Sequence, residues 1–221
     1  VAAVFAWQTF GLGLRWYISG HAPWSNAYET MVYVGWATVL SGLVFARRSR
    51  LAPALAALMG GVALFVSNLN WLDPQITPLV PVLKSYWLMI HVSVVTASYG
   101  FFGICAACGI ASLAATAFGR NLRELRAINE MAMIVGLALL TAGIFFGAVW
   151  ANESWGRYWG WDPKETWALI TMFAYALATH SRHIPRLDGP FAFDVLSVVC
   201  FSTVLMTFFG VNYYLSGLHS Y

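Results

Sequence analysis

The sequence predicts an all-α protein, a polytopic membrane bundle of about seven transmembrane helices that forms a single domain over residues 1–221. Two observations predict this class. The chain is 60% hydrophobic and only 10% charged, whereas the charged fraction of a soluble domain is nearer a quarter. Its apolar runs are also long and uncharged enough to cross a hydrocarbon core of roughly 30 Å, which takes about 20 helical residues.

The predicted spans follow one another along the whole chain. Polar or basic segments separate them, so that each apolar run has a defined beginning and end. The chain lacks a starting Met and a basic region before its first apolar run, so we interpret it as processed, or as part of a longer polypeptide, and not as opening with a signal peptide. In chain order the spans cover residues 1–19, 27–46, 51–67, 85–118, 127–151, 163–180 and 191–215.

Basic residues predict the orientation of the bundle. Eight of the 12 lysines and arginines fall on alternate connections, and cytoplasmic loops are enriched in such residues. We therefore expect the N-terminus in the cytoplasm, the C-terminus outside, and the loops 21–26, 68–84 and 152–164 on the extracytoplasmic face. The eight residues are Arg47, Arg48, Arg50, Arg120, Arg123, Arg126, Arg182 and Arg186.

The most distinctive segment is the extracytoplasmic loop 150–167, with four tryptophans, two acids and two bases among its last thirteen residues. One interpretation is an interfacial aromatic belt, since Trp and Tyr favour headgroup depth in any membrane protein. The other is a platform for a large, flat, amphipathic ligand, because the cluster is local, glycine-spaced and charged. Asp162 and Glu165 also fit a helix N-cap and a capping-box acid around Pro163, so capping and ligand contact both stay open for them.

Three of the five histidines are candidate ligands. His91 lies about two helical turns inside the outer end of its span, and His219 lies just beyond the outer end of the last span, so both can approach the tryptophan loop. His180 ends its span roughly 25 Å deeper, near the cytoplasmic face, and cannot share a metal ion with them. A histidine in a span is a functional candidate. An interhelical hydrogen bond also explains such a residue, and a histidine at a helix C-terminus can simply interact favourably with the helix dipole.

Imidazoles from different helices beside a bed of indoles fit an iron porphyrin, which needs axial ligands, aromatic contacts and donors for its propionates. The sequence thus favours haem as the ligand. Outer-face cations for the propionates are Arg157, Lys164 and Lys84. The pair Cys105 and Cys108 lies mid-span among small residues, where packing explains it better than thiol chemistry.

Several segments of the chain resemble one family, the system II cytochrome c synthases of the CcsA and ResC type, which are haem-handling membrane proteins with a WWD domain. Residues 84–93 (KSYWLMIHVS) resemble that family's first external histidine segment, and residues 150–167 (WANESWGRYWGWDPKETW) resemble its WWD loop. Residues 210–221 (GVNYYLSGLHSY) resemble its second external histidine segment. Residues 23–29 (PWSNAYE) also match a family segment, to which the sequence alone assigns no role.

The resemblance implies two non-covalent haem b sites. His91 and His219 would ligate an external haem on the WWD loop and act as the catalytic pair, and His180 would ligate a second haem inside the bilayer. The other ligand of that inner haem would come from a ResB- or CcsB-type subunit or fused moiety. The metal ligands are thus His91, His219 and His180, and the further haem-binding residues are Trp155, Arg157, Trp159, Trp161, Asp162, Lys164 and Trp167.

The implied activity is that of a holocytochrome c synthase, or haem lyase, active with its membrane partner in the inner membrane of a bacterium or in a thylakoid equivalent. Haem would cross the membrane and reach the external site, where the two thiols of a Cys-x-x-Cys-His segment of apocytochrome c add to its vinyl groups. Thiol-reducing proteins are further expected partners. The alternative is a haem-delivery or export protein of the other bacterial maturation pathway, without ligase activity. Nucleic acid is not indicated, because topology explains the net charge of +3.

Overall fold

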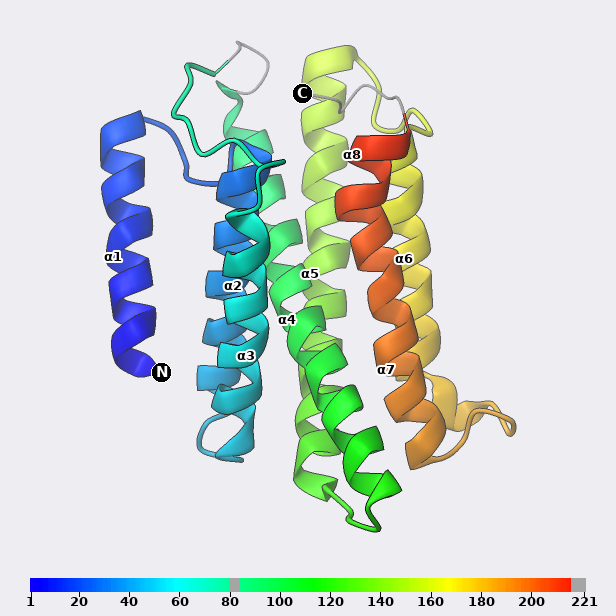
Figure 1. Ribbon diagram of the computed structural model, residues 1–221. Helices are drawn as coiled ribbons and strands as arrows, with labels where there is room; N and C mark the ends of the chain where they lie inside the picture. The colour runs from blue at the N-terminus through cyan, green and yellow to red at the C-terminus, as the bar shows by residue number, and fades with distance from the viewer. Residues whose placement is uncertain (80–83, 216–221) are drawn as a thin grey trace.

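The computed structural model describes residues 1–79 and 84–215, and within these ranges the chain forms helices and loops but no β-strand (Figure 1). This confirms the all-α class, and every α-helix overlaps a predicted apolar run, while the short 3₁₀ helix Ser181–His183 lies between two runs. A π-helical turn, Met206–Gly210, continues α7 directly into α8. The helices are α1 Ala2–Ser19, α2 Ala27–Val44, α3 Leu51–Ser67, α4 Tyr86–Ala117, α5 Arg123–Trp155, α6 Pro163–Thr179, the short η2 Ser181–His183, α7 Pro190–Leu205 and α8 Val211–Tyr214.

Three helices of the described chain are long and apolar enough to cross a membrane, judged by length and composition. They are α4, α5 and the continuous helix Pro190–Tyr214, and α3 is a shorter apolar helix. At 1.5 Å per residue, the 32 residues of α4 extend about 48 Å, which is more than a hydrocarbon core of roughly 30 Å. The ends of α4 therefore reach beyond the apolar core of a membrane.

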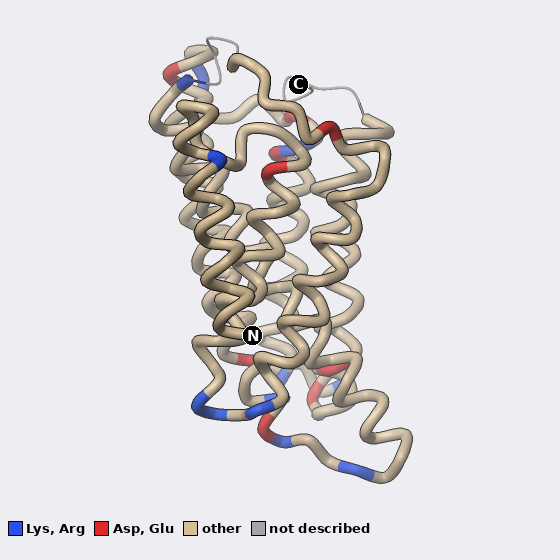
Figure 2. Tube along the Cα trace, turned by 60° about the vertical axis from the view of Figure 1, so that its left-hand side comes forward, with Lys and Arg blue, Asp and Glu red and all other residues tan. Residues whose placement is uncertain are grey.

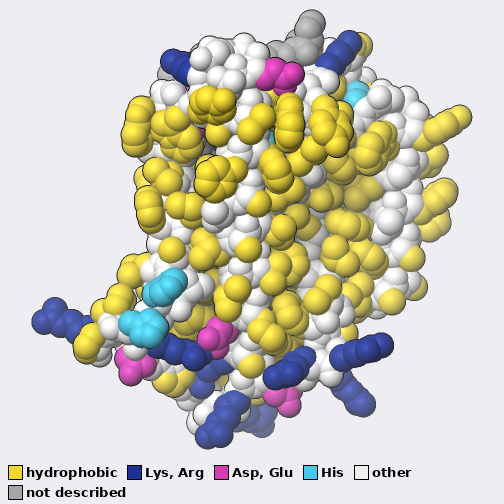
Figure 3. Space-filling view, turned by 180° about the vertical axis from the view of Figure 1, so that it is seen from behind, with side chains coloured by type: hydrophobic (Ala, Val, Ile, Leu, Met, Phe, Trp, Pro, Cys, Tyr) yellow, Lys and Arg dark blue, Asp and Glu magenta, His cyan; other side chains and the backbone are white. Residues whose placement is uncertain are grey.

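Consecutive long helices run in opposite directions, so their connections gather at two ends of the bundle (Figure 1). Most lysines and arginines lie at one of these ends, as Figure 2 shows, and the loop that follows α5 lies at the other. Between the two ends, the face seen in Figure 3 is covered mainly by hydrophobic side chains. Such a band is the surface expected of a protein that faces lipid.

The centre of the bundle is α4, which packs against α2, α5 and α7 through small residues. A Cβ atom added at Gly143 of α5 would lie 2.5 Å from Val95 Cγ2, and one added at Gly100 of α4 would lie 2.7 Å from the backbone of Ala37. Glycine at such positions lets helix backbones approach closely, which is a common device of membrane bundles. The close contact between α4 and α5 positions the residues of the functional site.

The three cysteines are buried and free, as expected for packing residues. Cys105 and Cys108 lie in the middle of α4, and Cys200 lies in α7. Cys105 Sγ approaches the carbonyl oxygen of Asn129 at 3.4 Å, and Cys200 Sγ approaches that of Ala174 at 3.4 Å, so two of the thiols serve as weak donors to neighbouring helices.

Candidate functional site

A cavity of about 820 Å³ opens at the end of the bundle that carries the tryptophan loop. Its size falls within the range of roughly 300–1,000 Å³ that is usual for sites of small molecules and cofactors. Residues from α2, α4, α5, α6, the π-helical turn Met206–Gly210 and α8 line it, and the segment 71–77 contributes a further part of the wall. Its aromatic residues and candidate ligands are Trp24, Tyr28, Trp71, His91, Tyr99, Trp150, Tyr158, Trp159, Lys164, Phe208, Phe209 and Tyr213.

His91 is half-buried on the cavity side of α4, and α5 fixes its ring. Its Nδ1 lies 2.7 Å from the carbonyl oxygen of Gly143, which can only accept, so Nδ1 carries the proton of the neutral ring. The lone pair is then on Nε2, and a carbonyl on the opposite nitrogen is the usual arrangement behind a metal-ligating histidine. A Cβ at Gly147 would lie 2.6 Å from the ring, so the glycine makes room for it.

The predicted WWD residues separate into two groups. Trp159 and Lys164 line the cavity together with His91, as do Tyr158 and Glu165. The structure does not bring the other predicted residues into this wall. Those outside the cavity lining are Trp155, Arg157, Trp161, Asp162, Trp167 and Lys84.

Two tryptophans of the loop contact other indoles. Trp155 packs edge to face on the buried Trp150, with ring centroids 4.7 Å apart. Trp161 is 70% exposed and has a φ of 57°, a left-handed conformation that is unusual for a bulky side chain. Its ring lies 5.8 Å from that of Trp159, at an interplanar angle of 88°. The backbone twist at Trp161 therefore sets the turn between Trp159 and the start of α6.

Asp162 and Glu165 form a capping box at the start of α6. Asp162 Oδ1 accepts a hydrogen bond from the amide of Lys164 at 2.9 Å. Glu165 Oε2 accepts from the amides of Gly160 and Asp162 at 2.8 and 3.2 Å. The capping role that the sequence left open for both acids is therefore present, and these bonds fix Lys164 relative to the loop.

Two of the lining residues carry polar side-chain groups, Trp159 in the loop and Lys164 at the start of α6. The indole Nε1 of Trp159 is buried and has no hydrogen-bond partner among the described residues. Nearby in the wall, Lys164 Nζ donates to Asn212 Oδ1 of α8 at 2.8 Å. An unpaired buried N–H is uncommon in native proteins, and where it faces a cavity it indicates a ligand acceptor.

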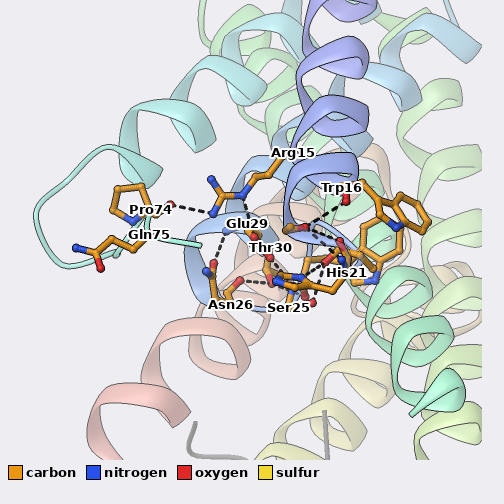
Figure 4. A network of polar contacts seen from close by, with 12 residues as sticks. Arg15, Trp16, His21, Ser25, Asn26, Glu29, Thr30, Pro74 and Gln75 are labelled. Atoms are coloured by element: carbon orange, nitrogen blue, oxygen red, sulfur yellow. Dashed lines mark hydrogen bonds and ion pairs between the residues drawn. The ribbon is translucent and has the colours of Figure 1, made fainter. Parts of the chain in front are cut away.

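The segment 23–29, which the sequence could not explain, forms the corner of the cavity between α1 and α2 (Figure 4). Glu29 is fully buried, and its Oε1 accepts from Arg15 Nε at 2.8 Å while its Oε2 accepts from the Ser25 amide at 2.9 Å. Arg15 also donates to the carbonyl oxygen of Pro74 at 2.9 Å. A single buried carboxylate thus joins the ends of two helices, and its arginine reaches the segment that walls the cavity.

Sequence reasoning missed the contributions of Arg15, Trp71 and Gly147. Trp71 stacks on Phe209 and Tyr213 with centroids 6.1 and 5.8 Å apart, which closes the wall against α8. The spacing of two glycines four residues apart on the fifth predicted span was the available signal for a close helix contact. Nothing in the sequence pairs Arg15 or Trp71 with their partners, because these contacts join distant segments.

His180 lies at the opposite end of the bundle, as the C-cap of α6, and is exposed. Its Nδ1 approaches the carbonyl oxygen of Ala176 at 2.8 Å, so it too presents Nε2 outward from a ring held by the backbone. His183 lies close by, with ring centroids 6.3 Å apart. His219, the other predicted ligand, lies outside the described residues.

The described residues fit a haem on three counts. The cavity is large and rich in aromatic residues, its histidine is oriented by a backbone carbonyl, and it holds a buried N–H and an ammonium group that suit a propionate. An iron porphyrin needs an axial nitrogen, flat apolar contacts and anion donors at one edge. These side chains and the fold define a helical membrane protein with an aromatic, histidine-bearing cavity at one end of its bundle.

The chain belongs to the family of cytochrome c assembly proteins, whose family model matches residues 24–219. It is 50% identical over 226 residues to Protein NrfI of Wolinella succinogenes, a match that covers 99% of this chain and 25% of that protein. It is 36% identical to the cytochrome c biogenesis protein CcsA of Guillardia theta, covering 96% of this chain and 81% of that protein. CcsA of Chlamydomonas reinhardtii is also 36% identical, with 94% and 63% covered.

These matches confirm the predicted resemblance to CcsA-type proteins of cytochrome c assembly, a family that handles haem. The chain spans about a quarter of the length of NrfI and about four fifths of the length of the Guillardia relative.

Proposed function

We propose that this chain is the membrane component of a cytochrome c synthase that carries haem across the membrane and presents it in the described cavity to apocytochrome c. The observation that carries this proposal is the position of His91, in an aromatic cavity, with its Nδ1 committed to the Gly143 carbonyl. Membership in a cytochrome c assembly family supports the haem-handling part. The lyase activity rests on the resemblance and on the chemistry of the site.

In this proposal the arginine-rich end of the bundle is cytoplasmic and the cavity faces the periplasm. The excess of arginines in alternate loops supports this orientation, because cytoplasmic loops of membrane proteins carry such an excess. Seven spans then place the N-terminal end inside and the C-terminal end outside, in the inner membrane of a bacterium. The attachment reaction therefore takes place where apocytochrome c is exported.

Haem enters the site as a substrate, and His91 supplies one axial nitrogen. We assign the second axial nitrogen to His219 because its segment resembles that of the family. Two imidazoles saturate the axial positions of the iron, which limits its reactions until the histidine of the apocytochrome replaces one of them. The aromatic side chains around His91 exclude water from the faces of the porphyrin.

The role of this chain in the attachment itself is to position the reactants. Each cysteine thiol of the apocytochrome adds across one vinyl group: a sulfur–carbon bond forms, the thiol hydrogen passes to the neighbouring carbon, and no electron is gained or lost overall. The reaction needs reduced thiols, which thiol-reducing proteins supply, and no nucleophile from this chain. Holding thiol and vinyl group in contact makes the addition effectively intramolecular, which is the main source of rate.

A second haem site belongs to the same proposal, at His180 near the cytoplasmic end. The Nδ1 contact with Ala176 supports a ligand role, because it leaves the lone pair on Nε2. The exposure of His180 supports completion of this site by a ResB- or CcsB-type subunit or fused moiety. Haem held there would be a way station between the cytoplasm and the outer cavity.

The first test is an absorption spectrum of the protein purified with its membrane partner, reduced and oxidised, for the unaltered chain, His91→Gly and His183→Gly. We expect a bis-histidine spectrum that His91→Gly alters and that added imidazole restores, since imidazole can occupy the space of the missing ring. His183→Gly at the opposite end is the matched control and should leave the outer site unchanged. A spectrum indifferent to His91 contradicts the proposal.

The alternative function is haem delivery without ligation. The product of the reaction distinguishes it from a synthase. When the protein is expressed with an apocytochrome c that carries one Cys-x-x-Cys-His segment, a synthase leaves haem attached to the cytochrome polypeptide on a denaturing gel. A delivery protein leaves haem bound to this chain and none attached to the cytochrome. The second result, together with an intact His91-dependent spectrum, would favour the delivery function.

A further inference from the structure

Trp159 lines the cavity and carries a buried donor that has no acceptor within the described part of the chain. Its Nε1 is shielded from solvent, it has no hydrogen-bond partner among the described residues, and its side chain forms part of the cavity wall. Burying an indole N–H without an acceptor is costly, and native structures usually satisfy such a group with protein, water or ligand. The unpaired atom therefore indicates where a ligand places an acceptor.

The surroundings of Trp159 favour a negatively charged acceptor. Lys164 lines the same cavity, and its ammonium group donates a 2.8 Å hydrogen bond to Asn212 Oδ1. The nearby acids are committed to the backbone: Asp162 accepts from the amide of Lys164, and Glu165 accepts from two amides of the loop. A cation and an indole N–H thus belong to the same wall at the start of α6.

We propose that Trp159 Nε1 and Lys164 Nζ together bind a carboxylate of the ligand, which for haem is a propionate. The proposal rests on the proposed function and deepens it, because it makes carboxylate recognition the basis of substrate choice in the cavity. Trp159 then acts as a hydrogen-bond donor, and its contribution depends on the N–H group. Arg157, which is exposed and outside the cavity lining, takes no part.

The test compares ferric haem with ferric haem dimethyl ester, in which both propionates are neutral. Binding to the detergent-purified complex with its membrane partner is followed by absorbance titration. We expect the unaltered protein to bind haem about tenfold or more tightly than the ester, because hydrogen bonds to charged groups are the strong ones. Trp159→Phe, which keeps a flat ring but removes the N–H, should weaken haem binding about tenfold and leave ester binding unchanged.

Lys164→Met should behave like Trp159→Phe, because it removes the ammonium group and keeps an unbranched side chain. Trp7→Phe on the outer surface of α1 is the matched control, since its indole is 75% exposed and lies on a helix that does not line the cavity. The control should preserve the preference for haem over the ester. Similar unfolding temperatures of all four proteins would show that the variants are folded.

Three outcomes overturn the carboxylate site. Equal binding of haem and ester by the unaltered protein would exclude recognition of a propionate, while haem binding itself would still support the proposed function. An equal loss of both ligands in Trp159→Phe would mean that the indole packs against the porphyrin or binds water. If the unaltered protein binds neither ligand, the proposed function fails, and the carboxylate site fails with it.

Discussion

The geometry of His91 depends on two glycines of the neighbouring helix. Gly143 offers its carbonyl oxygen to Nδ1, and Gly147 leaves the space into which the ring fits. A larger residue at either position would move α5 away from α4 or rotate the imidazole, since helix backbones are rigid on this scale. The orientation of the ligand is therefore a property of the contact between α4 and α5 and depends on more than the histidine itself.

Gly147→Ala tests this dependence. The added Cβ would lie 2.6 Å from the His91 ring, so we expect the ring to shift and the His91-dependent haem spectrum to weaken, with a loss of about 1–3 kcal/mol in stability from overpacking. Thermal unfolding and absorption titration measure the two effects. Gly61→Ala on α3 is the control, because its Cβ would meet no atom within 4 Å. Identical haem titrations of Gly147→Ala and the unaltered chain would refute the role of this glycine.

A buried ion pair between Arg15 and Glu29 lies behind the corner of the cavity that residues 24–28 form. Glu29 has no exposed side-chain surface, and Arg15 has 20%, so the pair is largely removed from water. Burying charges is costly, and the cost is offset only when the remaining polar atoms are satisfied. Both carboxylate oxygens of Glu29 do have donors, which explains why an acid is tolerated inside this apolar protein.

At the level of elements, the start of α6 is the best-defined feature of the tryptophan loop. The capping box and the proline at its first position begin the helix directly after the loop. Trp159 and Lys164 therefore lie on either side of a backbone turn that the capping box holds in one conformation. A loose loop could carry the same residues without placing them in one wall.

Substitutions at Asp162 separate helix capping from contact with the ligand. Asp162→Ala removes the cap and should lower the stability of the protein by about 1 kcal/mol, with weaker haem binding as a consequence. Asp162→Asn keeps a good N-cap and loses only the charge, so it should restore most of both properties. Thermal unfolding and haem titration of the two variants provide the measurement. An Asn variant as defective as the Ala variant would mean that the carboxylate charge itself is required.

The elements themselves were largely predictable, and the site was predictable only in part. Runs of apolar residues define α1 to α6, and the continuous helix Pro190–Tyr214, within four positions, because a span must satisfy its backbone internally. The sequence placed His91 and the loop of Trp159 at one end, and the structure brings both into one cavity. It did not predict that Arg157 and Trp161 lie outside the cavity lining, because the direction of a loop side chain depends on local backbone twists.

At the scale of the whole molecule, basic loops and the aromatic cavity occupy opposite ends of the bundle. The antiparallel order of the helices follows from the short connections between them, and the charge asymmetry follows from the positions of the arginines. The arrangement of the helices does not by itself indicate which end of the bundle faces the cytoplasm. The charged loops predict which end faces the cytoplasm, because cytoplasmic loops are enriched in arginine and lysine.

Cysteine labelling in intact cells measures the orientation. Thr77→Cys lies in the segment of the cavity wall, and Arg48→Cys lies in an exposed loop at the arginine-rich end. We expect a membrane-impermeant maleimide to label Thr77→Cys in intact cells and to label Arg48→Cys only after the cells are broken. The natural cysteines are buried and give a low background. The reverse pattern of labelling would invert the topology and place the cavity in the cytoplasm.

The hydrogen bond from Arg15 to the Pro74 carbonyl oxygen joins the cavity-lining segment 71–77 to α1, the most loosely packed helix of the bundle. No residue of α1 is buried, and the helix packs mainly against α2. The side chain that neutralises Glu29 also restrains the segment around Trp71, so a displacement of α1 relative to α2 pulls on that segment. The position of the cavity wall around Trp71 is therefore linked to the position of α1 through a single arginine side chain.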